Sequence, residues 1–136
     1  PDAFKSELLS GTHNFANGGN SFKIALYTDI SGFSASSTAY SATGEVSSSG
    51  TSYPAAGQAL DSQAVAVASN VAYVDFADEV FSSVTLSAVG AIIYNDTNAD
   101  KLVVVLDFGG TKTATNGDFT IQFPAAGAST AILRIA

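Results

Sequence analysis

A very short connection between two apolar runs constrains this fold more than any other feature. The runs are Ala91–Asn95 (AIIYN) and Lys101–Leu106 (KLVVVL), and only the five residues Asp96–Asp100 (DTNAD) separate them. A parallel pair of strands needs a crossover of about a dozen residues or more, whereas antiparallel strands can be joined by a tight turn. The sequence therefore predicts an antiparallel hairpin with its turn at Asp96–Asp100.

The second apolar run continues into LDFGGTKT, which also has to be weighed as a nucleotide-binding strand. In that case Gly109 and Gly110 would open a phosphate loop, and a helix N-terminus would have to come directly after them. The chain instead continues to Asn116-Gly117, a strong hairpin signal, with no amphipathic helix and without the GxxxxGK[ST] spacing. We therefore expect the two glycines to bend or bulge a strand at a sheet edge, with a further hairpin turn at Asn116-Gly117.

The rest of the chain is also typical of strands. In Phe22–Asp29 (FKIALYTD), alternation puts Phe22, Ile24 and Leu26 on one face. The neutral segment from Ile30 to Pro54 is expected to form loops around one short strand near EVSSS. Further strands are expected within residues 58–69, 71–78, 86–96, 101–110, 118–124 and 131–136.

These elements define the expected fold class. Turn signals separate about eight strands at intervals of roughly 8–12 residues, which is the spacing of a sandwich or barrel. Hydrophobic residues make up 46% of the 136 residues and charged residues only 12%, enough apolar surface for one core. We predict a single all-β domain over residues 1–136, a jelly-roll-like antiparallel β-sandwich with a short N-terminal helix or arm at residues 1–12.

The N-terminal segment PDAFKSELLS has apolar residues at helical spacing, namely Phe4, Leu8 and Leu9. A helix this short is marginal in water, so its apolar face must pack on something. It can pack on its own sandwich or on a neighbouring subunit. We favour the neighbour, because the strands can cover one another and chain ends commonly form exchangeable arms.

The strand that begins at Lys101 is apolar on both faces. Simple alternation groups Leu102, Val104, Leu106 and Phe108 on one face and Val103, Val105 and Asp107 on the other. One face would meet the opposing sheet, and the other would need another subunit or the N-terminal arm. The residues predicted to lie at a partner interface are therefore Phe4, Leu8, Leu9, Val103 and Val105.

Charge and composition exclude several classes of partner. Twelve acidic and five basic residues give a net charge of −7, which disfavours nucleic acid and anionic membranes. No apolar run approaches the ~20 residues that a membrane-spanning helix needs. The chain has no Cys, so disulfides and thiolate metal sites are impossible. Without a signal segment at its start, we expect it to be made in a cytoplasm.

His13 is the only histidine, and it lies beside expected turns in GTHNFANGGN. It could be imagined in a Ser/His/Asp arrangement, but no G-x-S-x-G elbow surrounds any serine. An exposed or hydrogen-bonded loop histidine is the favoured interpretation.

The acidic turn Asp96–Asp100 resembles the first half of a calcium loop, and Asp107 stands where the twelfth ligand would fall. Lys101 occupies the sixth position, where that loop needs glycine. We therefore expect an ordinary hairpin turn, with weak ion binding as the alternative.

Asp75, Asp78 and Glu79 form the densest group of carboxylates in the chain. A glycosidase needs two carboxylates about 5–9.5 Å apart across a cleft, and nothing in the sequence places these residues so. We interpret them as solvated turn acids and predict neither a cofactor nor a metal.

One family resemblance covers nearly the whole chain. The C-terminal half, with VDFAD, AIIYN, VLDFGG, FTIQFP and the terminal ILRIA, and the N-terminal FKSELLSGTHNF and SFKIALYT are similar to a family of small virion structural proteins of tailed bacteriophages. Its members look like cement or decoration proteins, with a jelly-roll sandwich over the joints between major capsid subunits on the outside of the head.

The resemblance implies a non-enzymatic cement protein on the outer surface of the virion, made in the cytoplasm of a bacterial host. Its implied partners are the major capsid protein and itself, as a homodimer or homotrimer. The alternative is a tail, neck or fibre component that binds a host surface glycan, since jelly rolls also serve as lectins. A virion glycosidase that uses the acids above is the third hypothesis.

Overall fold

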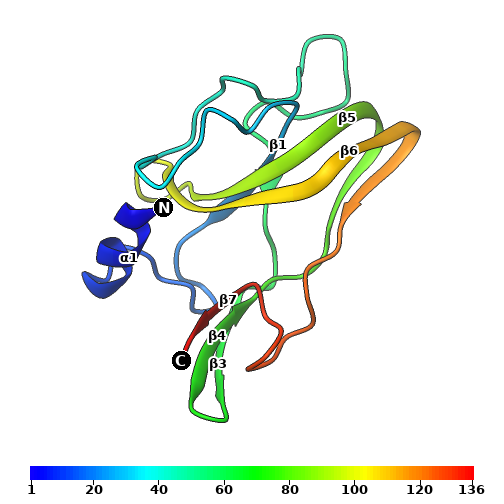
Figure 1. The fold of residues 1–136 in the computed structure, drawn as a ribbon. Coiled ribbons are helices and arrows are strands. Elements are labelled where there is room, and N and C mark those ends of the chain that lie inside the picture. Colours follow the sequence, from blue (N-terminus) through cyan, green and yellow to red (C-terminus); the bar gives the residue numbers. More distant parts are fainter.

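A computed structural model describes residues 1–136 as one helix and seven strands in two antiparallel sheets (Figure 1). The larger sheet has the order β2-β1-β5-β6 and the smaller one the order β3-β4-β7. The elements are α1 (Asp2–Leu9), β1 (Phe22–Tyr27), β2 (Gln58–Ala59), β3 (Ala64–Ala68), β4 (Val71–Asp75), β5 (Glu79–Asn95), β6 (Lys101–Ile121) and β7 (Leu133–Ile135).

The predicted hairpin at Asp96–Asp100 is confirmed. Strands β5 and β6 pair antiparallel from Asn95 opposite Lys101 to Glu79 opposite Ile121, and they form the long curved ribbon of Figure 1. Antiparallel pairing excludes the parallel nucleotide-binding strand that LDFGG could have formed. As expected, the glycines lie in an edge strand, since β6 ends the larger sheet.

Gly109 and Gly110 form the expected bulge. Ala88 pairs with Lys112, and the next pair is Gly90 with Asp107. Between these two pairs, the four residues 108–111 of β6 lie opposite the single residue Val89 of β5. Both glycines have positive φ, 70° and 150°, which glycine adopts without the steric cost of a Cβ atom. The bulge lets the ribbon bend, because the extra residues lengthen one strand against the other.

The second hairpin turn, predicted at Asn116-Gly117, is wrong. β6 runs through both residues, and Asn116 sits in a smaller bulge with φ of 47°. Its backbone N–H donates to Thr85 Oγ1 at 2.9 Å, so a side chain of β5 replaces the missing ladder bond. Because Asn tolerates positive φ, it is suited both to a turn and to a bulge. Here β5 is long enough to pair with β6 beyond Asn116, so the chain forms a bulge and does not turn back.

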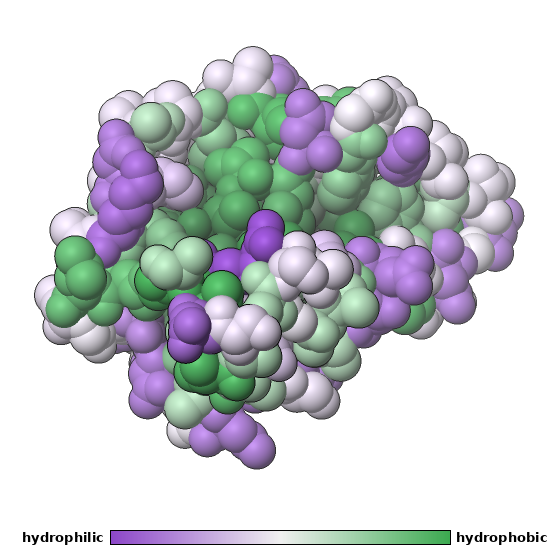
Figure 2. Space-filling model, turned by 60° about the horizontal axis from the view of Figure 1, so that its bottom comes forward, coloured by the Kyte–Doolittle hydropathy of each residue, from purple (hydrophilic) through white to green (hydrophobic).

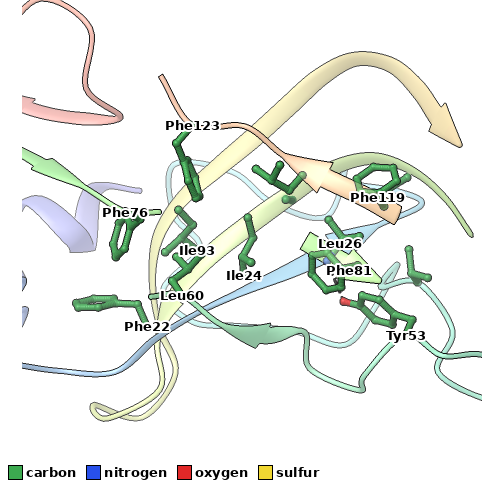
Figure 3. Close-up of a cluster of buried hydrophobic side chains, with 14 of the residues drawn as sticks. Phe22, Ile24, Leu26, Tyr53, Leu60, Phe76, Phe81, Ile93, Phe119 and Phe123 are labelled. Carbon is green, nitrogen blue, oxygen red and sulfur yellow. Dashed lines mark hydrogen bonds between the residues drawn. The ribbon is translucent and has the colours of Figure 1, made fainter. Parts of the chain in front are cut away.

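The main core lies inside the curved ribbon (Figure 3). Phe22, Ile24 and Leu26 of β1 all lie in it, which confirms the predicted face of that strand. Phe81 of β5 and Phe119 of β6 belong to the same buried cluster. The part of the β5–β6 hairpin that is distant from the Asp96–Asp100 turn therefore packs against β1. The β5–β6 hairpin therefore contributes side chains to two sides of the core, together with β1.

The strict alternation predicted for Leu102–Asp107 is wrong at its beginning. Ile93 pairs with Val104 but Tyr94 pairs with Leu102, so Val103 is an extra residue in a bulge. Val103 and Val104 both pack with the main core, whereas Leu102 and Val105 pack with the cluster on the opposite face. The bulge shifts the alternation by one residue.

The second face of the larger sheet is covered by the same chain. A smaller cluster there contains Ala25, Tyr27, Ile92, Tyr94 and Leu102, and Ile30, Phe33 and Tyr40 pack against it. Part of the neutral loop segment therefore provides the cover that we expected from another subunit or from the N-terminal arm.

Tyrosines and one carboxylate tie this loop segment to the sheet. Glu45 accepts hydrogen bonds from the hydroxyls of Tyr40 and Tyr53, at 2.5 and 2.8 Å. The Tyr27 hydroxyl donates to the Ser41 carbonyl and the Tyr94 hydroxyl to the Ala56 carbonyl, both at 2.6 Å. Desolvation on burial raises the pKa of all four tyrosines well above the ordinary value of 10.0.

The all-β class and the two packed antiparallel sheets agree with the predicted sandwich. The strand expected near EVSSS does not form, because Glu45 makes only an isolated bridge with Tyr27. The chain has seven strands where about eight were expected, and the jelly-roll connectivity stays a prediction.

Candidate functional site

An apolar groove of about 370 Å³ lies between α1 and the three-stranded sheet. We call it the apolar groove. Its sheet side consists of Val65 of β3, Ala72 and Val74 of β4, and Leu133 and Ile135 of β7. Its other side is formed by Phe4 and Leu8 of α1 and by the His13–Ala16 segment.

The register of the small sheet explains why one of its faces is wholly apolar. Val65, Val74 and Leu133 stand directly opposite one another across the three strands, and Val67, Ala72 and Ile135 form the next row on the same face. Directly opposed residues share a face of a sheet. The first row adjoins the main core through Val74, which is buried, and the second row extends beyond it.

This face keeps large apolar side chains in contact with water. Val65 is 52% exposed, Val67 72% and Ile135 57%, and Leu9 at the end of α1 is 91% exposed. Figure 2 turns the lower side of the molecule forward and shows apolar side chains gathered in a hollow on that side. Large contiguous apolar surface is a feature of interaction sites on folded proteins, which makes this face the candidate site.

His13 closes the inner end of the groove and is buried, with 5% of its surface exposed. Asn95 Oδ1 accepts from the backbone N–H groups of Thr97 and Asn98, which turns Asn95 Nδ2 toward His13 Nδ1 at 3.0 Å. Since Nδ2 only donates, Nδ1 is the acceptor, and the neutral ring carries its proton on Nε2, 3.1 Å from Glu7 Oε2. Both ring nitrogens are engaged in structural bonds, as expected for a hydrogen-bonded histidine, although the ring is not exposed.

Glu7 connects α1 to the hairpin. Its carboxylate accepts from His13 and from Lys101 at the start of β6. Burial opposes the charged form, but the hydrogen bonds from Lys101 and His13 outweigh it and hold the pKa of Glu7 below its ordinary value. These bonds fix the helix that forms one wall of the apolar groove.

We expect Glu7→Gln to destabilise the fold by about 1–2 kcal/mol at neutral pH, because it removes a charge-assisted bond to Lys101. The folded pKa of Glu7 is lowered from 4.5, so its contribution is complete above that pH and is lost as the pH falls through the folded value. Urea unfolding of both proteins from pH 7 to pH 3 measures this difference, which should shrink on acidification.

The matched control is Asp2→Asn, which removes the exposed Lys5–Asp2 pair on the same helix and should have no measurable effect. Equal stabilities of Glu7→Gln and the unmodified chain at pH 7 would contradict the anchoring role of Glu7.

The structure distributes the five predicted interface residues over different environments. Phe4 and Leu8 pack against the main core of their own chain, so our preference for a neighbouring subunit is wrong for these two side chains. Leu9 points into solvent. Val103 is 1% exposed within the core, and Val105 is half-buried beside the loop that contains Phe33. A partner role for the set stays a prediction, for which Leu9 offers the most surface.

The acidic turn is held by structural bonds. Asp96 pairs with Lys23 at 3.0 Å, and the Asn98 side chain donates to the Thr12 carbonyl. Asp107 cannot act as the twelfth ligand, because it lies six residues along β6 from Lys101, roughly 20 Å away at the usual rise of a strand. Asp107 instead accepts from the Gly109 N–H in the bulge, at 2.8 Å.

The other acids have separate structural partners. Asp78 accepts from the backbone N–H of Phe123 at 2.8 Å, and Glu79 is buried and hydrogen-bonded to Gln58. Glu79 is therefore not the solvated turn acid that we predicted. No group of three or more His, Asp or Glu side chains lies close enough together to hold a metal ion.

The sequence pattern indicates one wall of the apolar groove but not the other. Helical spacing singles out Phe4 and Leu8, whereas Val65, Val67 and Ile135 lie in predicted strands with no feature that indicates a site. A weak signal was present in the segment AVAVA, where every residue is apolar and no face is marked as solvated.

The fold is all-β, and its exposed apolar groove is the candidate site. No family model, no curated protein and no solved structure matches the chain. The single helix, α1, has eight residues, and no helix is long and apolar enough to cross a membrane.

Proposed function

We propose that this chain is a non-enzymatic cement protein that attaches to the outer surface of a bacteriophage head, at contacts between major capsid proteins. The family resemblance of the sequence names this role, and the apolar groove is the observation that carries it. A cement protein needs a rigid body and a surface that becomes buried on its neighbours. The core inside the bent hairpin provides the body, and the groove provides the surface.

The chemistry of the groove favours a protein partner. Its lining is mostly apolar, and Arg134 and His13 are its only ionisable side chains apart from Tyr73. Sugars are bound through many polar groups beside a stacking aromatic ring, and the groove offers few polar groups. This supports the capsid proposal over the alternative of a glycan-binding tail, neck or fibre component.

Charge supports the outer location. A chain with net charge −7 would be repelled by packaged DNA inside the shell, whereas the outside imposes no such cost. The jelly-roll connectivity, synthesis in the host cytoplasm and assembly as a homodimer or homotrimer belong to the same proposal.

The test adds the purified protein to heads assembled without it and measures bound protein per head. We expect Ile135→Lys and Leu9→Lys to reduce binding at least tenfold, because each places a charge on exposed apolar surface at or beside the groove. Val80→Lys is the matched control, since Val80 is 39% exposed on β5 and does not line the groove. All variants should melt like the unmodified chain.

Copy number distinguishes the two binding hypotheses. Hundreds of copies spread over the head in a low-resolution particle map agree with a cement protein, whereas density confined to the tail vertex overturns the proposal. Hydrolysis of host surface glycan by the purified chain would also overturn it, in favour of the glycosidase hypothesis.

A further inference from the structure

The free edge of β3 is the strongest unexplained feature outside the apolar groove. β3 pairs only with β4, and no hydrogen bond outside that ladder involves Ala64–Ala68. Four of its five residues are exposed. The outward backbone N–H and C=O groups of this strand are therefore free to pair with another strand.

This edge lacks the usual protection against pairing. Natural edge strands are blunted by charged side chains, prolines or bulges. The nine residues Ser62–Asn70 contain no charge and no proline, and the register of β3 with β4 is unbroken. An unprotected edge of this kind either aggregates or has a defined partner.

We propose that β3 pairs antiparallel with β3 of a second copy, so that the two small sheets join into one six-stranded sheet around a two-fold axis at Ala66. The sequence of β3, AVAVA, is the same in both directions. With Ala66 on the axis, Val65 of one copy stands opposite Val67 of the other, and only alanines meet on the other face. Both apolar pairs then lie on the face that lines the apolar groove.

Charge favours this site for contact between two copies. Each chain carries −7, so two copies repel each other at most approaches. The uncharged run Ser62–Asn70 is a place where they can meet without opposing like charges. Asp75, the nearest acid on β4, stands opposite Ala64 and thus at the end of the strand, away from the axis.

The dimer would also reduce the exposed apolar surface. Val67 is the most exposed of the three exposed large apolar side chains on the small sheet, at 72%, and pairing places it against Val65, which is 52% exposed. A two-fold axis perpendicular to the sheet leaves both apolar grooves open on the same side. If the proposed function holds, such a dimer binds one capsid surface at two points.

Two variants and one crosslink test the pairing. The full chain should sediment at twice its 13.7 kDa mass, and Val67→Lys should sediment as a monomer with an unchanged melting temperature. Ile135→Lys is the matched control, because it places the same charge on the same face but on β7, two strands from the axis. Ile135→Lys should remain dimeric and lose capsid binding. Sedimentation therefore tests the dimer, and binding to heads tests the cement role separately.

The absence of cysteine allows a direct measurement of register. Residues opposite each other on antiparallel strands have Cα atoms about 4.5–5.5 Å apart, which a disulfide can span. Ala66→Cys should therefore form a covalent dimer on mild oxidation, and Val80→Cys should not. A chain that sediments as a monomer up to about 100 μM, or as a trimer without crosslinking at Ala66, overturns the proposal.

Discussion

At pH 12 this protein should be unfolded. Tyr27, Tyr53 and Tyr94 are at most 2% exposed, and their burial raises the pKa of each well above 10.0. A group whose folded pKa is raised stabilises the fold below its unfolded pKa, and this stability is lost as the pH rises above that value. Each of the three tyrosines then costs about 1.4 kcal/mol per pH unit above pH 10, or about 8 kcal/mol together at pH 12.

A loss of that size is comparable with the whole free energy of unfolding of a small domain, about 5–15 kcal/mol. The measurement follows phenolate absorbance and circular dichroism in the same samples from pH 9 to pH 12.5. Both signals should change together, because these hydroxyls ionise only when the chain opens. Tyr53→Phe should lower the slope of stability against pH by about 1.4 kcal/mol per unit. Ionisation of all the tyrosines near pH 10 in a chain that stays folded would contradict the burial described here.

Val103→Lys should unfold the chain or cost at least about 4 kcal/mol, because it places an ammonium group in the main core, where Val103 is 1% exposed. Val105→Lys is the matched variant on the same strand. Val105 is half-buried at the smaller cluster, so a lysine there can extend its charge to water, and we expect a cost near 1 kcal/mol. Chemical denaturation with sedimentation separates effects on folding from effects on assembly.

The two variants also test the bulge at Val103. Without the bulge, Val103 and Val105 would share a face and respond alike to the same substitution. Similar costs for both variants would show that the strand alternates regularly and that the register described here is wrong.

Local chemistry was sufficient for several elements. The five residues Asp96–Asp100 allow only a tight turn, and the alternation in Phe22–Leu26 assigns those side chains to the core. The absence of a helix after Gly109 likewise excludes a phosphate loop, and the paired glycines predict the bulge that forms there. In each case the deciding interaction lies within a few residues along the chain.

Other features depend on partners that are distant in the sequence. The long β5 keeps Asn116-Gly117 in a ladder where the pair by itself favours a turn. The bulge at Val103 moves Leu102 and Val103 to the faces opposite to those that alternation predicts. The cover of the second sheet face comes from residues 30–40, a segment with no regular element of its own. Local preference predicts none of these three features. Each depends on which apolar surface of the sheet would otherwise stay exposed to water.

The candidate site shows the same division. Residue spacing alone places Phe4 and Leu8 on one side of a helix and allows AVAVA to form a strand. Long-range contacts place α1 across the apolar groove from the small sheet, where Glu7 binds Lys101 and His13. The same packing leaves Val65, Val67 and Ile135 exposed. Apolar patterning indicates which side chains avoid water, but the exposure of each side chain depends on how far the folded core extends. Here the core ends before the small sheet does, so the outer row of that sheet stays in contact with water.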